Sequence, residues 1–142
     1  MIDIEDKILK ALQTGVTTAV QGSNIPAFPI KYIGKIFNPP DDGKYIEIVY
    51  IPNNINGEFW SSGKTYRGLF RLILHWGLFE QGAYEPLRFF ASVTQYFSIG
   101  EVFQYSGVSV KITAEPDLTG VIENAPDLMY PLTIRYETFK KA

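Results

Sequence analysis

The chain has 142 residues, a formal net charge of −2, 46% hydrophobic residues and no cysteine. A chain of this length buries roughly 68–70% of the surface that its unfolded form exposes, so we expect residues 1–142 to form one domain. The slight negative charge argues against general electrostatic binding of nucleic acid. The lack of cysteine excludes disulfides, zinc–thiolate sites and a cysteine nucleophile.

Neither a secretory signal nor a membrane span is expected. The first residues have the pattern of an acidic amphipathic helix, whereas a signal peptide has a basic region followed by an apolar core. No apolar run approaches about 18 residues, the length that crosses a bilayer. Aromatic residues make up 15% of the chain, which fits either a rigid core or a contact surface.

The first predicted element is a helix over about residues 3–21. Its apolar residues recur every four positions: Ile4, Ile8, Leu12 and Val16. Gly22 is a natural C-terminal stop, and Gly15 weakens the middle by roughly 1 kcal/mol relative to alanine. Polar residues occupy the opposite face, so we expect the helix to lie on a sheet with one side in water.

Residues 23–43 are rich in proline and glycine and predict a connecting stretch, with a short edge strand at 30–33. A turn at 37–43 leads into a strand at 45–51, in which Glu47 points away from the core.

After a break at 52–57, residues 65–76 are predicted to form a long strand with apolar residues on both faces. One face has Leu69, Arg71 and Ile73, and the other has Phe70, Leu72 and Leu74. This pattern predicts a central strand that is covered on both sides or lies at a subunit contact.

A second helix is predicted over about residues 84–98, with Pro86 in its first turn. Its apolar stripe consists of Leu87, Phe90, Ala91 and Phe97, widened by Phe89, Val93 and Tyr96. Alternation predicts strands at 108–113 and 132–137, with a hairpin edge at 103–108 and an irregular segment at 116–128. We therefore predict an α+β fold: a single mixed or antiparallel sheet of about 4–5 strands with two helices packed on it.

The sequence contains no arrangement typical of a catalytic or metal site. His75 is the only histidine and lies in an apolar run, so a structural or interface role is favoured over that of a catalytic base. Asp41 and Asp42 fit turn chemistry, while Asp117, Glu123 and Asp127 are scattered in a loop. We expect no enzyme activity, no metal and no cofactor.

Basic residues leave three alternatives open. Arg67, Arg71 and Arg88 are either separate surface charges or, together with Lys64, a basic face that pairs across a subunit boundary. Contact with nucleic acid is the third alternative.

Aromatic side chains in or beside Gly/Pro/Asn-rich segments have two interpretations. They are Phe37, Phe59, Trp60, Trp76 and Phe79. Either they plug the ends of the core, or they anchor a contact between subunits, where aromatic residues are enriched. Together with Arg67 and Arg71, these five are the candidate interface residues.

The order of several segments resembles the tail terminator proteins of long-tailed, non-contractile phages of the lambda type. An N-terminal amphipathic helix is followed by FNPP at 37–40 and YIEI at 45–48, and then by GLFRL at 68–72. The second helix ends in YFSIG at 96–100, and the chain closes with YPLTIRY at 130–136. The resemblance covers nearly the whole chain. Two segments depart from it: residues 53–64, which contain Trp60, and the bulky WGLF at 76–79.

The resemblance implies a structural protein of the virion tail, assembled in the cytoplasm of the host bacterium. Members of this family form a hexameric ring on the end of the tail tube, stop tube polymerisation and offer a surface to the head. The implied partners are further copies of the chain, the major tail-tube protein and a head–tail connector protein. No membrane and no specific nucleic acid is implied.

Two other functions remain alternatives. One is a different head–tail connector or tail-completion protein. The other is a small-ligand-binding α+β module whose aromatic residues line a pocket, which ligand would stabilise against heat.

Overall fold

The structure is a computed structural model that describes residues 4–52, 56–57, 63–77, 84–124 and 127–141. Helix α1 spans Glu5–Gln21, as the four-residue spacing predicts, and buries Ile8, Leu12 and Val16. Gly15 has a packing role that the sequence did not reveal. A Cβ at Gly15 would lie 2.6 Å from the Phe103 ring, so glycine lets the ring pack against the helix.

The strands in the described part of the chain form one nine-stranded sheet. Its main order is β1 (Ile30–Lys31), β2 (Tyr45–Pro52), β4 (Gly63–Gly77), β9 (Asp127–Lys141), β6 (Val108–Ile112) and β5 (Val102–Tyr105). Strand β3 (Asn56–Gly57) pairs with β4, while β7 (Asp117–Leu118) and β8 (Ile122–Asn124) pair with β9. Among these described strands, β1 and β2 pair in parallel and the other pairs are antiparallel. The α+β class is confirmed, and so is the central place of the strand predicted at 65–76.

The predicted strand number of 4–5 was too low, and the segment at 116–128 is not wholly irregular. Strands β7 and β8 bond to one edge of β9, and Thr119 N donates to Pro131 O at 3.1 Å. Strands of two or three residues are too short to show an alternating pattern. A partner distant in the sequence, β9, supplies their hydrogen bonds.

Helix α2 spans Tyr84–Thr94 and continues as a 3-10 turn, η1, over Gln95–Phe97. Its buried side differs from the predicted stripe. Phe89, Phe90 and Val93 are buried, whereas Leu87 and Ala91 are exposed. Because Phe89 packs on Phe28, with the ring centroids 4.3 Å apart, the helix turns this side toward the core.

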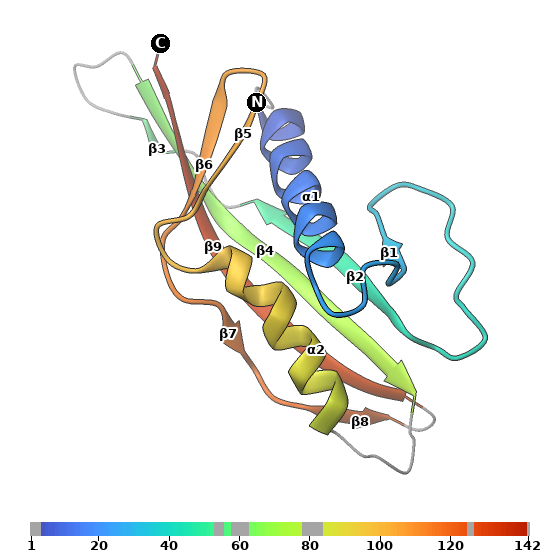
Figure 1. Cartoon of the computed structure of the whole chain (residues 1–142). Helices are drawn as coiled ribbons and strands as arrows, with labels where there is room; N and C mark the ends of the chain where they lie inside the picture. Colours follow the sequence, from blue (N-terminus) through green and yellow to red (C-terminus); the bar gives the residue numbers. More distant parts are fainter. Residues whose placement is uncertain (1–3, 53–55, 58–62, 78–83, 125–126, 142) are drawn as a thin grey trace.

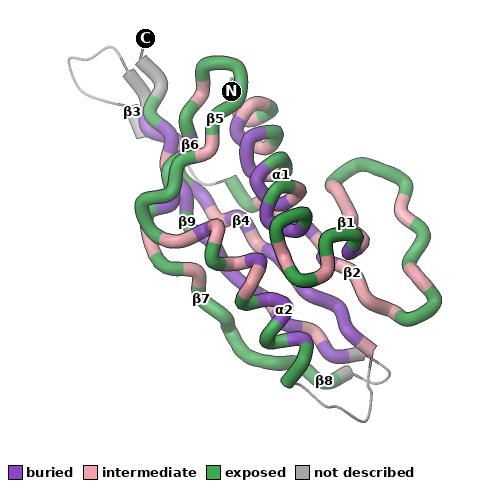
Figure 2. Tube along the Cα trace, viewed as in Figure 1, coloured by how far each residue is buried: buried purple, intermediate pink, exposed green. Residues whose placement is uncertain are grey.

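Both helices lie on the same face of the sheet (Figure 1). The sheet residues beneath them alternate along β2, β4 and β9, and they include Ile46, Ile48, Phe70, Leu72, Leu74, Tyr130, Leu132 and Ile134. These side chains form one buried cluster with the apolar sides of the helices. Figure 2 shows buried positions on both helices and on the central strands behind them. The opposite face of the sheet carries neither helix.

Candidate subunit-contact surface

The sheet face turned away from the helices, here called the open face, is a mixed surface of apolar and charged side chains. Cross-strand register places its residues in rows: Tyr45, His75 and Met129; Glu47, Ile73 and Pro131; Val49, Arg71 and Thr133; Ile51, Leu69 and Arg135. Most of these residues are half-buried although no helix covers them. The apolar residues in these rows make the open face a candidate surface for contact with another protein.

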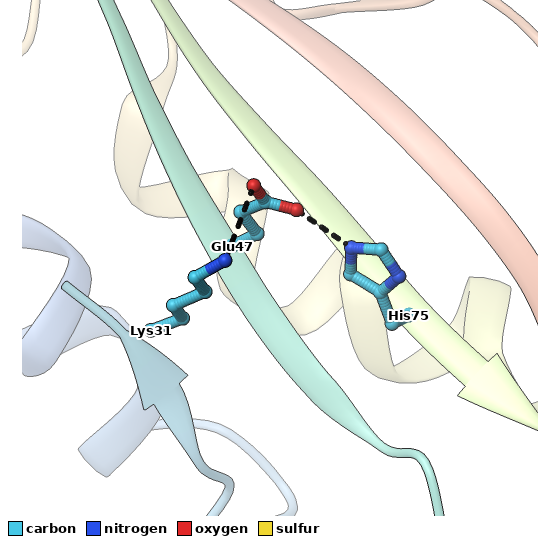
Figure 3. A network of polar contacts seen from close by, with 3 residues as sticks. All are labelled: Lys31, Glu47 and His75. Carbon is cyan, nitrogen blue, oxygen red and sulfur yellow. Dashed lines mark hydrogen bonds and ion pairs between the residues drawn. The ribbon is translucent and has the colours of Figure 1, made fainter. Parts of the chain in front are cut away.

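A polar network crosses one end of the open face (Figure 3). Glu47 on β2 reaches His75 on β4, with Oε1 2.9 Å from Nε2, and its Oε2 lies 3.8 Å from Nζ of Lys31 on β1. The His75 ring stacks on Tyr45, with the centroids 4.3 Å apart and the planes at 11°. The network therefore ties β1, β2 and β4 together, and the imidazole is held on two sides.

This geometry favours a structural role for His75. The residue is only 8% exposed, one ring nitrogen faces a carboxylate, and one ring face is covered by an aromatic side chain. Among the described residues, no group of three His, Asp or Glu side chains is placed to hold a metal ion. Chemically, the arrangement can fix the strands and present charge to a neighbour.

Removing the carboxylate is expected to loosen this end of the sheet. Glu47→Ala leaves a nearly buried imidazole nitrogen without its acceptor, so we expect a loss of about 1–2 kcal/mol in the free energy of unfolding. Glu47→Gln keeps a side-chain oxygen for the same hydrogen bond and should lose less. Urea unfolding of the two variants measures the difference, and equal losses would contradict a role for this bond.

The arginines predicted to form a basic face do not all share one surface. Arg67 and Arg71 lie on the open face, whereas Arg88 is on helix α2, where its guanidinium is 4.8 Å from the centre of the Tyr84 ring. Arg67 pairs with Glu137 of β9, Nε to Oε2, at 2.8 Å. In contrast, Nε of Arg71 is buried and has no hydrogen-bond partner among the described residues. The side chain of Lys64 lies outside the described part.

The candidate aromatic residues fall into three groups. Trp76 is 2% exposed and packs against Phe28 and Phe89, so its ring belongs to the core of the single chain. Phe37 is half-buried, with its ring 5.0 Å from that of Tyr45. Phe59, Trp60 and Phe79 lie outside the described residues.

The structure also draws attention to a residue that the sequence analysis passed over. Ile36, next to Phe37, is 97% exposed. Phe37 is half-buried, with its ring packed on that of Tyr45, whereas the side chain of Ile36 faces solvent. The sequence feature that could have indicated an exposed Ile36 is its position beside the aromatic, proline-rich segment 37–40.

Comparison with known proteins decides the family. The sequence profile of the phage tail terminator protein family matches residues 7–136. The chain belongs to the phage tail terminator protein family. A search of curated proteins found no match. A solved structure superposes with a TM-score of 0.77 at 20% sequence identity, over 94% of this chain and 94% of its own. At this identity the superposition shows a shared fold alone.

Membership in the phage tail terminator family gives the chain a structural role in a phage tail and places it in the virion tail. The matched region contains α2, all of α1 except its first two residues, and the rows of the open face, so these surfaces belong to the part of the chain that defines the family. None of the described helices is long and apolar enough to cross a membrane.

Proposed function

We propose that this tail terminator caps the end of the tail tube as a ring of identical subunits, stops tube polymerisation and provides the surface that joins the head. The observation that carries the proposal is the family match over residues 7–136. The partners are further copies of the chain in a hexamer, the major tail-tube protein and a head–tail connector protein. Assembly takes place in the cytoplasm of the host bacterium.

The open face supports a contact role within this proposal. A ring of identical subunits needs an interface between two different surfaces of the subunit, one from each neighbour. The open face offers half-buried apolar rows, with Arg71 half-buried among them and Arg67 exposed on the same strand. Arginine and aromatic side chains are enriched where proteins meet. Arg67, Arg71 and Phe37 therefore remain candidate interface residues.

Tube length tests the proposal. Tail-tube protein from the same phage is polymerised with and without the purified terminator, and tube lengths are measured by negative-stain electron microscopy. We expect the terminator to bind tube ends and to stop their growth. Tubes of equal length in both samples, with no protein at their ends, would contradict the capping function.

A matched variant separates capping from chemistry. His75→Gln keeps a polar side chain that can bond to Glu47, and we expect it to cap tubes as the wild type does. The genes beside this one give an independent check. Connector genes on one side and a tail-tube gene on the other would supply the two partner proteins for purification.

A further inference from the structure

The loop between β1 and β2 presents a large, exposed apolar side chain. Ile36 is 97% exposed, and the loop that carries it projects beyond the β1 edge of the sheet (Figure 1). One end of the loop is bonded to α1, where Ile33 N donates to Oε1 of Gln13 at 3.2 Å. A turn near the other end is closed by the bond from Gly43 N to Pro40 O at 3.0 Å. Because the ring of Phe37 packs on Tyr45, the segment next to Ile36 is anchored as well.

A groove lies between α2 and the segment that leads into β7. Its volume is about 350 Å³, more than one isoleucine side chain requires. Phe90 and Leu132 are buried at its base, while Leu87 and Leu118 are 38% and 39% exposed. These two leucines give the groove apolar sides that solvent reaches. Leu87 is a residue that the sequence predicted to face the core.

Charge around the two features is complementary. Lys35 directly precedes Ile36 and forms no ion pair with a described residue. Glu115 lines the groove, where Oε1 accepts a hydrogen bond from Ile99 N at 3.2 Å, and exposed Asp117 follows two residues later. Neither carboxylate has a cationic partner in the described part of the chain. A positive charge on the loop thus matches negative charge beside the groove.

The loop and the groove lie toward opposite edges of the sheet. Strand β1 is the outermost strand on one side, and β7 pairs with β9 on the other side, beyond β2 and β4. A protrusion and a matching groove on opposite sides of one subunit make a head-to-tail contact, which generates a closed ring when the rotation between subunits is right.

We propose that Ile36 of one subunit inserts into the groove of the next, between Leu87 and Leu118, with Lys35 beside Glu115 and Asp117. This contact rests on the proposed ring and specifies which surfaces close it. The packing of Phe37 on Tyr45 favours binding, because it reduces the conformational freedom that the loop loses when it docks.

Cysteine cross-linking tests the contact directly, since the natural chain has no cysteine. The variant Ile36→Cys/Leu118→Cys is oxidised while bound to tail tubes and analysed on a non-reducing gel. We expect a ladder of covalent multimers. A mixture of the two single variants should give cross-linked dimers and no larger species. The control is Ile36→Cys/Tyr105→Cys, because Tyr105 is 42% exposed but lies on the β5–β6 hairpin; it should give no ladder.

Each outcome decides between the ring and this particular contact. If the wild type caps tubes and the ladder is no stronger than that of the control, the contact is overturned and capping stands. If the wild type does not cap tubes, the proposed capping function is rejected. Cross-linking of the double variant is then measured in concentrated solution without tubes. A ladder there supports the contact, and its absence overturns it. Cross-linked dimers alone from the double variant would indicate a two-fold contact and overturn the head-to-tail arrangement.

Two substitutions give a second readout. Ile36→Asp should weaken tube capping at least tenfold while leaving the melting temperature of the monomer unchanged, because the side chain contacts solvent in the single chain. Lys35→Glu should weaken capping less, and combining it with Asp117→Lys should restore part of the loss. Full capping by Ile36→Asp would overturn the proposal. It would also be overturned if Lys35→Glu lost the same amount of capping with and without Asp117→Lys.

Discussion

Replacing Trp76 with alanine is expected to lower the free energy of unfolding by about 3–5 kcal/mol, the usual cost of removing a large buried aromatic side chain. Trp76 is 2% exposed near the end of β4, and its ring centroid lies 5.8 Å from that of Phe28 and 6.1 Å from that of Phe89. The Nζ of Lys44 lies 4.4 Å from the centre of the Trp76 ring. The substitution therefore leaves a cavity between the sheet, α2 and the segment containing Phe28.

The measurement is urea unfolding of the isolated monomer, followed by circular dichroism. Ile36→Ala is the matched control, because it also removes a large apolar side chain but from a position that is 97% exposed. The control should unfold at the wild-type urea concentration. If Trp76→Ala unfolds like the wild type and only assembly is lost, the Trp76 ring acts as a subunit anchor and the packing argument is wrong.

Gly68→Ala is expected to destabilise the sheet by about 3 kcal/mol, toward the upper end of the range for overpacked cores. A Cβ at Gly68 would lie 2.5 Å from the hydroxyl oxygen of Tyr136 and 2.7 Å from the carbonyl oxygen of Ile51. Tyr136 is directly opposite Gly68 on β9, is 2% exposed and stacks on Tyr50. Burial raises the pKa of the Tyr136 hydroxyl well above its usual value, so the group is neutral.

Gly15→Ala is the control for Gly68→Ala, because it makes the same change of residue type at a site where the atoms nearest the new Cβ belong to a side chain. Its Cβ would also come close to another group, 2.6 Å from the Phe103 ring, but that ring is a half-buried side chain that can shift. Alanine also favours the helix by about 1 kcal/mol over glycine. Thermal unfolding of both variants should show a large loss for Gly68→Ala and a small change for Gly15→Ala. Equal losses would mean that the carbonyl of Ile51 does not resist the new Cβ.

Local pattern accounts for much of the fold. The four-residue spacing of α1 and the alternation in β4 predicted their extents to within two residues, and the division of β4 into two faces was also right. Such patterns work because one face of each element packs against the core along its whole length. The family resemblance in the order of segments was confirmed by the profile match.

The pairing of distant segments was decided only by the tertiary structure. Strands β7 and β8 form because β9 is long enough to pair with several strands along one edge. The sequences of β7 and β8, two and three residues long, contain no pattern that predicts this pairing. The orientation of α2 depends on the contact of Phe89 with Phe28, more than 60 residues earlier, and this contact leaves Leu87 beside the groove. The network of Lys31, Glu47 and His75 likewise needs the register of three strands.

The sequence by itself determined the α+β class, the places of the long elements and the family, because local periodicity and the order of motifs lie within the sequence. The tertiary structure decided which face stays open, which aromatic residue is core and where the exposed Ile36 and the groove lie. These properties depend on which side chains meet across the sheet. Trp76 and Ile36 illustrate the difference: both are large and apolar, yet one is 2% exposed and the other 97%.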